Sequence, residues 1–341
     1  MISVVVVNWN REALLRDCLR SLATQTMSPQ EVIVVDNASS DGSMAMAQRV
    51  FAHNAHFDLR LIENKANLGF CEANNQGIAV ARGEFIALLN NDAEAEPGWL
   101  KALRSGFDDS RIGMVASKVL VHEDPSRIDK VGHLIYRDGQ NRGRGAGEID
   151  RGQYDRREAV LWPDGCAAMY RKAMLEEIGG FDQDFFAYAD DAELGLRARI
   201  AGWDCLYVPE ARVRHHRGQT LGLASVRRLA LIERNRILLV AKLFPWNWLL
   251  ATPFYFGLRL AAGVWAALLG QGETRHYPGV SGKLRLAEGL LRGQWEALWL
   301  LPRILRKRKE IERFRKRSDA EIIELLRKHG ISLREISTQA I

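Results

Sequence analysis

The stretch FIALLNNDAEAEPGWL, residues 85–100, is an apolar run that stops on two asparagines and an aspartate. Its first five residues are apolar without polar alternation, which is typical of a buried strand, and Pro97 is placed to open a helix. The polar residues at the strand end have two interpretations. They can be turn formers and helix caps, or Asp92 can hold a metal ion at the carboxyl edge of a parallel sheet, where open α/β folds bind ligands.

Upstream and downstream of this stretch, apolar β-rich runs alternate with helix-like segments over the first 120 residues. Strand and helix at this rhythm predict an α/β fold, with a mostly parallel, Rossmann-like sheet and helices on both faces. The expected strands are 2–7, 32–35, 59–62, 85–89 and 114–119, and the expected helices are 12–23, 43–52, 72–81 and 98–107.

Several of these strands end in polar residues. Asn8 follows the first strand, Asp36 and Asn37 follow the second, and 90–92 follow the fourth. One polar strand end is a cap, but several at the same edge of a parallel sheet outline a ligand site.

The whole chain has 341 residues, enough for one large domain or two ordinary ones, and its hydrophobic fraction of 47% supports a sizeable core. The four cysteines lie far apart without a C-x-x-C pair, which argues against a zinc site or disulfide framework and favours a reducing cytosol. The N-terminus lacks the basic and apolar regions of a secretory signal.

From about residue 122 to 162 the pattern is lost, and this Gly- and Arg-rich stretch predicts a functional or mobile loop. A helix is expected after it, beginning near Asp190. Asp190 and Glu193 have the spacing of a capping box, and Gly202 is a plausible helix stop.

Residues 243–270 are almost wholly apolar but are interrupted by Pro245, Pro253 and Arg259. Three interpretations stay open: an interfacial or re-entrant helix pair, a true membrane span, or helices packed on the protein. Residues 303–317 hold nine Lys or Arg against two Glu. Charge alone fits a solvated helix face, anionic lipid or nucleic acid. Its pairing with the apolar segment favours an anionic membrane surface over nucleic acid.

Six blocks between residues 2 and 220 carry a resemblance when taken in order. They are VVVVNWN, VVDNASSDGS, ENKANLGFCEANNQG, LLNNDA, GGFDQDFFAYADDAELGLR and VRHHRGQT. Together they resemble the inverting family 2 glycosyltransferases of GT-A (nucleotide-diphospho-sugar transferase) fold, most closely the rhamnosyltransferase-like branch that builds lipid-linked saccharides. The resemblance implies a catalytic domain over 1–220, with a nucleotide-sugar-binding half (1–120) and an acceptor half (121–220). The composition of 221–341 predicts a helical, membrane-associating region after it.

By this resemblance Asp36 accepts the imino proton of a pyrimidine base, and Gly69 lets the backbone pass close to the ligand. The implied nucleotide-binding residues are Asn8, Asp36, Asn37, Asn67, Gly69, Asn75, Asn90 and Asn91.

The NND block stands at the family's D-x-D position. The resemblance therefore implies that Asp92 binds a divalent cation, Mg²⁺ or Mn²⁺, which neutralises charge on the departing diphosphate. His215 matches a further metal ligand or phosphate contact, with His216 as the alternative. Asn90 replaces the first acidic residue of the pattern, so the metal affinity is expected to be weaker than in relatives.

The acidic pair of the fifth block implies that Asp191 is the catalytic carboxylate and Asp190 its acidic neighbour. Inversion by single displacement needs one carboxylate to take the proton of the acceptor hydroxyl. Asp191 is expected in the first turn of a helix, where the helix dipole favours the ionised form. Asp190 is expected to cap that helix.

Three other functions would each require a sequence feature that can be checked here. A nicotinamide or flavin enzyme needs G-x-G-x-x-G after the first strand, and NWNRE has no glycine there. A processive membrane synthase needs several spans and a Q-x-x-R-W block. A non-catalytic nucleotide-sugar-binding partner subunit would have lost Asp191 and Asp92, which are both present.

The sequence therefore predicts a glycosyltransferase of cell-surface polysaccharide biosynthesis, peripheral on the cytoplasmic face of the cell membrane. Its expected donor is dTDP-rhamnose or a UDP-sugar, and its expected acceptor is a polyprenyl-linked saccharide. The sequence leaves the oligomeric state open.

Overall fold

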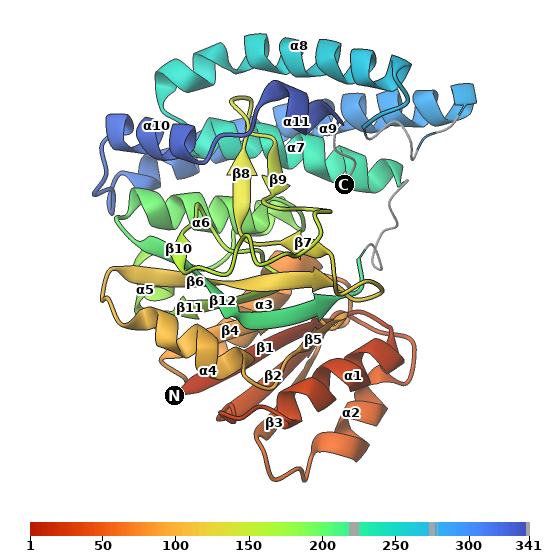
Figure 1. The fold of residues 1–341 in the computed structure, drawn as a ribbon, viewed down its shortest axis with the longest axis vertical. Helices are drawn as coiled ribbons and strands as arrows, with labels where there is room; N and C mark the ends of the chain where they lie inside the picture. The colour runs from red at the N-terminus through yellow and green to blue at the C-terminus, as the bar shows by residue number, and fades with distance from the viewer. Residues whose placement is uncertain (218–224, 273–276, 278, 339–341) are drawn as a thin grey trace. The chain divides into compact units, whose positions relative to one another are not determined.

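The computed structural model describes residues 1–217, 225–272, 277 and 279–338. The chain divides into two compact units, one made of 1–132 and 143–217, the other of 133–142 and the residues beyond 217 (Figure 1). The domain boundary expected after residue 220 lies outside the described residues. Segment 133–142, expected in the acceptor half, groups with the second unit. It does so because the backbone of Ile135 donates to His329 and accepts from Ile331, both in the second unit.

The first unit is built on a ten-stranded sheet in the order β10-β12-β6-β11-β4-β1-β2-β3, with β5 paired to β12 and β7 to β6. Its strands are β1 (Ile2–Asn8), β2 (Glu31–Asp36), β3 (Asp58–Glu63), β4 (Phe85–Leu89), β5 (Ala93–Ala95), β6 (Ile112–Val121), β7 (Ile128–Lys130), β10 (Glu158–Ala159), β11 (Ala167–Arg171) and β12 (Asp204–His215).

Strand direction brings the predicted polar strand ends to one edge. β3, β2, β1 and β4 are parallel, β11 is antiparallel to both β4 and β6, and β6 is parallel to β12. The carboxyl ends of β1, β2, β4, β6 and β12 therefore share an edge with the amino end of β11. The register agrees, because Asn8 pairs with Asp36 and Leu89 with Ala167.

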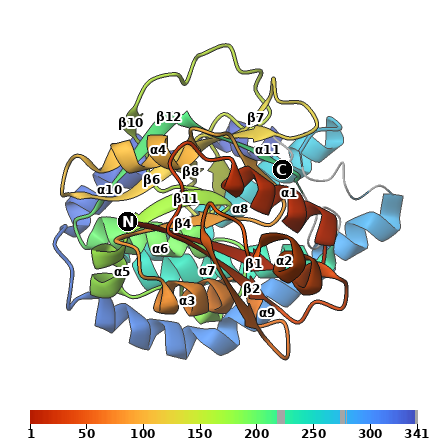
Figure 2. The same ribbon diagram turned by 90° about the horizontal axis from the view of Figure 1, so that it is seen from below.

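Helices cover both faces of this sheet. Leu15, Leu19 and Leu22 of α1 are fully buried in the core with Val4 and other residues of β1 and β2. On the opposite face, α3 lies so close to β1 that a Cβ at Gly77 would be 2.4 Å from Val5. Figure 2 shows α1 and α2 side by side. The helical elements are α1 (Glu12–Ala23), α2 (Ser43–Phe51), α3 (Gly69–Val80), α4 (Trp99–Arg104), η1 (Ser105–Phe107), α5 (Lys172–Ile178), η2 (Gln183–Phe185) and α6 (Asp190–Ile200).

The second unit joins a hairpin to helices. Small residues of α9 let its backbone approach α7, and a Cβ at Gly293 would be 2.5 Å from the carbonyl oxygen of Ala230. A buried charge network holds the hairpin to α7 and α8, since Arg236 and Arg259 both reach Asp138. The elements are β8 (His133–Ile135), β9 (Asn141–Gly143), α7 (Val226–Leu243), α8 (Trp246–Leu268), α9 (Gly279–Ile311), α10 (Asp319–Lys328) and α11 (Leu333–Thr338).

The structure decides two local questions. Of the three interpretations of the apolar segment, the helix pair is excluded, because Trp246–Leu268 form the single helix α8 and Pro253 does not end it. The stretch from 122 to 162 contains the short strands β7 to β10 and is not one aperiodic loop. Among the described residues, α8 alone is long and apolar enough to cross a membrane by length and composition.

Candidate active site

The polar ends of β1, β2 and β4 meet in one hydrogen-bonded group. Asn8 is fully buried and donates from Nδ2 to Oδ1 of Asp36 at 2.9 Å, while its own Oδ1 accepts from Nδ2 of Asn91 at 2.8 Å. Oδ2 of Asp36 accepts the backbone N–H of Ser39 at 2.8 Å. Asn8, Asp36 and Asn91, all expected at a nucleotide site, therefore lie together.

The loop before α3 is fixed by two further asparagines. Asn37 donates from Nδ2 to the carbonyl of Gly69 at 3.1 Å, and Oδ1 of Asn67 accepts the Gly69 N–H at 2.9 Å. Gly69 has φ +85°, and a Cβ there would be 2.5 Å from the ring of Phe186. The close approach that requires glycine here is thus to Phe186.

Asn75 is positioned differently from the other asparagines. Its side-chain amide forms two hydrogen bonds with the backbone of Phe181. Nδ2 donates to the carbonyl of Phe181, and Oδ1 accepts from its N–H, each at 2.8 Å. Asn75 therefore fixes the segment that leads towards α6, and its polar atoms do not lie in the strand-end group. We keep it as a positioning residue.

Asp92 and His215 form the expected pair at the ends of β4 and β12. Oδ1 of Asp92 lies 3.4 Å from Nε2 of His215, and it is buried without a hydrogen bond to any described residue. Nδ1 of His215 is 2.8 Å from Asp129, which also pairs with Arg217. A buried carboxylate oxygen that contacts an oriented imidazole at 3.4 Å, and has no hydrogen bond to the described residues, fits a divalent cation.

The charge state of His215 follows from its two carboxylate neighbours. Burial alone would lower the pKa of His215, but the bond to Asp129 and the nearby Asp92 outweigh burial and raise the pKa to about 9. As an imidazolium, His215 can contact a phosphate oxygen. After loss of the Nε2 proton it can ligate a cation.

Asp191 reaches the NND block through one short turn. Its Oδ2 lies 3.4 Å from the backbone nitrogen of Gly165. The carbonyl of the following residue, Cys166, accepts the Asn90 N–H at 2.8 Å. The candidate base and the candidate metal block are therefore linked by residues at the amino end of β11.

The expectation that Asp190 caps α6 was wrong. The N-cap is Ala189, and Asp190 is the first helical residue, with its side chain buried. Burial, and then the charges of Asp191 and Asp164, raise the pKa of Asp190 well above its ordinary value. The pair is thus divided into a buried Asp190 with a raised pKa and a half-buried Asp191.

The backbone before α6 is strained at three positions. Phe186, Tyr188 and Ala189 have φ of 63°, 69° and 53°, which is left-handed conformation without glycine. The carbonyl of Phe186 accepts the N–H groups of Phe70 and Cys71 at the start of α3. Strain held by the surroundings is common at functional sites, and here it lies directly before Asp191.

Comparison with known proteins identifies the family. Residues 3–179 match the model of the family "Glycosyl transferase family 2". The chain belongs to this family.

Two relatives illustrate the neighbourhood of this glycosyltransferase. It is 26% identical over 311 residues to an N-acetylglucosaminyl-diphospho-decaprenol L-rhamnosyltransferase of Mycobacterium tuberculosis, covering 85% of this chain and 98% of the relative. It is 28% identical to the O-antigen biosynthesis protein RfbC of Myxococcus xanthus over 74% of this chain and 20% of the relative.

Solved structures of glycosyltransferases share its GT-A fold. A mannosyltransferase from Pyrobaculum calidifontis, in complex with GDP-Man and Mn²⁺, superposes with a TM-score of 0.56 at 19% identity over 87% of both chains. Residues 1–349 of S. aureus TarS, in complex with UDP, give 0.53 at 16% identity over 98% of this chain and 90% of that chain.

The structure of this glycosyltransferase adds three site residues that the sequence did not suggest. Asp129 orients His215, and Asp164 pairs with Nζ of Lys130 at 2.8 Å beside the Asp191 turn. Asp129 and Lys130 lie in the stretch without period. The one available signal was for Asp164, because the Asp-Gly dipeptide at 164–165 is typical of a turn before a strand.

Proposed function

We propose that this family 2 glycosyltransferase transfers one sugar, with inversion, from a pyrimidine nucleotide donor to a lipid-linked acceptor, with Asp191 as the base. The observation that carries the proposal is the link from Asp191 through Gly165 and Cys166 to Asn90. That link supports a base and a leaving-group site at one edge of the sheet.

In the proposed reaction Asp191 takes the proton of the acceptor hydroxyl as its oxygen attacks the anomeric carbon. The bond from that carbon to the diphosphate oxygen breaks, and the nucleotide diphosphate leaves with the electron pair. Burial beside two carboxylates raises the pKa of Asp190 and favours its neutral form, so we assign the basic role to Asp191.

Asp92 and His215 would hold a divalent cation, Mg²⁺ or Mn²⁺, which supplies positive charge to the departing diphosphate. The buried Oδ1 of Asp92, which contacts Nε2 of His215 at 3.4 Å and has no hydrogen bond to the described residues, supports this assignment. Asn90 contributes an amide in place of a second carboxylate, and the proposed affinity for the ion is correspondingly modest.

The donor base is proposed to meet Asp36. Its carboxylate accepts hydrogen bonds from Asn8 and Ser39, and because an ionised carboxylate offers about four lone-pair sites, one remains for the imino proton of thymine or uracil. Similarity to a rhamnosyltransferase over nearly its full length supports dTDP-rhamnose, with a UDP-sugar as the other donor.

The experiment is thermal stabilisation by a panel of dTDP-rhamnose, UDP-sugars and GDP-mannose, each with and without Mn²⁺. A donor at about a hundred times its Kd adds ~2.7 kcal/mol to the unfolding free energy. We expect pyrimidine donors to stabilise the protein, more so with Mn²⁺, and Asp36→Asn to remove the effect. Equal stabilisation by GDP-mannose would rule out the proposed base recognition.

The acceptor is proposed to be a polyprenyl-linked saccharide, met at the cytoplasmic surface of an anionic membrane. Two exposed apolar stripes in the helical unit support this. On α8 the stripe comprises Trp246, Leu250, Phe254, Leu258, Trp265 and Leu268, and on α9 it comprises Leu284, Leu291, Trp295, Leu298 and Trp299. Amphipathic helices with aromatic residues and nearby cations bind membrane interfaces.

The basic residues of 303–317 do not all belong to the proposed lipid surface. Arg303, Arg306 and Lys309 are exposed and suit anionic headgroups. Arg308 is buried, stacks over Trp246 at 4.4 Å and donates to the carbonyl of Ala241. Arg308 therefore holds α9 against its neighbours and is excluded from the proposed lipid surface.

A further inference from the structure

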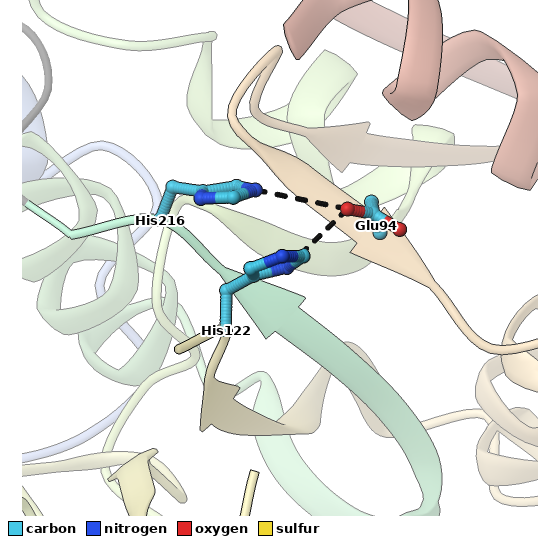
Figure 3. Close-up of side chains that lie close together, drawn as sticks. All are labelled: Glu94, His122 and His216. Carbon is cyan, nitrogen blue, oxygen red and sulfur yellow. Dashed lines mark ion pairs between the residues drawn. The ribbon is translucent and has the colours of Figure 1, made fainter. Parts of the chain in front are cut away.

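A second group of metal-ligand side chains lies at the same sheet edge but outside the Asp92–His215 pair. Glu94 comes from β5, His122 follows β6 and His216 follows β12 (Figure 3). Three separate strands thus converge on one point. We call this group the Glu94 cluster.

The ligand atoms are close enough for a shared ion. Oε1 of Glu94 is 3.3 Å from Nδ1 of His122 and 3.7 Å from Nε2 of His216, and the three ligand atoms lie within 4.8 Å of one another. Two ligands bound to one zinc ion at about 2.0–2.2 Å in tetrahedral geometry are roughly 3.3–3.6 Å apart. The cluster is near that spacing.

Supporting side chains orient the cluster. Nδ1 of His216 lies 3.2 Å from Oε1 of Glu123, which leaves Nε2 directed towards Glu94. A carboxylate behind a histidine is the usual support of a metal-binding imidazole. Arg214 lies 3.7 Å from Oε2 of Glu94, so the other oxygen, Oε1, remains for an ion.

Nδ1 of His122 is also a sign of a missing ligand. This nitrogen is buried and contacts Oε1 of Glu94 at 3.3 Å, but it forms no hydrogen bond to any described residue. A buried polar nitrogen without a hydrogen bond is unfavourable by about 1–3 kcal/mol, and coordination of an ion shared with Glu94 would satisfy it.

We propose that Glu94, His122 and His216 bind a transition-metal ion of the zinc class, separate from the cation of the donor site. Two imidazoles and one carboxylate favour zinc-like ions over Mg²⁺, which prefers oxygen ligands. The ion joins the ends of β5, β6 and β12, and so braces the edge from which Asp92 and His215 extend.

Binding requires a small rotation of the rings. The two imidazoles are stacked with centroids 3.5 Å apart and planes 26° apart, so an ion between the two nitrogens would lie out of at least one ring plane. The rotation would fall on His122, whose side chain is 27% exposed. Glu123 keeps the orientation of His216.

The test is a Co²⁺ titration of the untagged, EDTA-treated full chain, followed by visible absorption and by metal analysis after gel filtration. We expect one strongly bound Co²⁺ that Zn²⁺ displaces and Mg²⁺ does not. His122→Ala and Glu94→Gln should each weaken binding at least about tenfold, and Glu123→Gln about tenfold through lost orientation.

Two variants act as matched controls. Asp92→Asn removes the donor-site ligand two residues from Glu94 and should keep the absorption band, whereas His56→Ala removes an exposed histidine of another loop and should change nothing. Unfolding temperatures in EDTA show which variants are folded. Absence of tight Co²⁺ binding, or a band that survives in folded Glu94→Gln and disappears in Asp92→Asn, would overturn the proposal.

Discussion

At the residue scale, Glu31 illustrates how the charged residues of the first unit are stabilised. Its carboxylate is fully buried at the start of β2 and accepts hydrogen bonds from Ser3, Arg82 and Arg60. Burial would raise the pKa of Glu31, but these hydrogen bonds outweigh burial and lower it. A lowered pKa in the folded state stabilises the protein above the unfolded pKa of about 4.3, and this stabilisation is lost as the pH falls through the folded value.

Glu31→Gln should therefore lower the free energy of unfolding at pH 7 by roughly 2–3 kcal/mol. The difference from wild type should shrink as the pH falls below about 4, because the wild-type carboxyl then protonates as well. Urea unfolding across this pH range measures both quantities. Glu63→Gln, at an exposed position of β3, is the control and should change little. A loss that is independent of pH would contradict the explanation.

Asp129 gives a second prediction at this scale, because it holds Nδ1 of His215. Asp129→Asn should weaken Mn²⁺-dependent donor binding about 10- to 100-fold by releasing the imidazole. Calorimetry with the donor and Mn²⁺ measures this. The control is Asp124→Asn, which alters an exposed pair with Arg127. Unchanged Mn²⁺ affinity in Asp129→Asn would remove His215 from the metal assignment.

At the element scale, the sequence predicts a helix or strand best where the apolar pattern of that element alone is enough to identify it. α1 begins and ends where its apolar period does, and the β4 strand is buried over its whole length. Asn8, Asp36 and Asn91 were predictable because they follow such strands. The three-residue strands β7, β8 and β9 were not, because a strand of three residues is too short to show a period. Asp129, which lies in β7, was missed for the same reason.

Gly69 connects two of these elements, since α3 begins there and the ring of Phe186 lies against its Cα. Gly69→Ala should lower the free energy of unfolding by roughly 1–3 kcal/mol, and it should reduce transfer because the Phe186 loop leads to Asp191. Gly98→Ala is the control, since its Cβ would meet nothing within 4 Å. Equal stability of the two variants would show that the Phe186 contact does not restrict residue 69.

At the scale of the whole molecule, the chain has a GT-A unit and a helical unit. The sequence described the surface of the helical unit only by its composition. Apolar content was visible in 243–270. Which side chains face outwards depends on how α7 packs on α9 through Gly289 and Gly293. Likewise, the burial of Arg308 depends on Trp246, far away in the sequence.

The proposed lipid surface predicts the behaviour of paired tryptophans on α9. Trp295 and Trp299 are 62% and 73% exposed, and Trp295→Glu with Trp299→Glu should reduce binding to anionic vesicles at least about tenfold, because both apolar area and charge attraction are lost. Vesicle co-sedimentation measures this. Val50→Glu, an exposed apolar site on α2, should bind as wild type does. Undiminished binding of the double variant would place the lipid contact elsewhere.

The assignment of the base is tested most directly by comparing Asp191→Asn with Asp190→Asn in one transfer assay alongside donor calorimetry. Asp191→Asn should lose about 10²- to 10⁴-fold in turnover while its donor affinity stays near wild type. Asp190→Asn should lose far less, since a neutral amide there resembles the neutral carboxyl that burial favours. Near-normal turnover of folded Asp191→Asn, or a greater loss in Asp190→Asn, would contradict the mechanism.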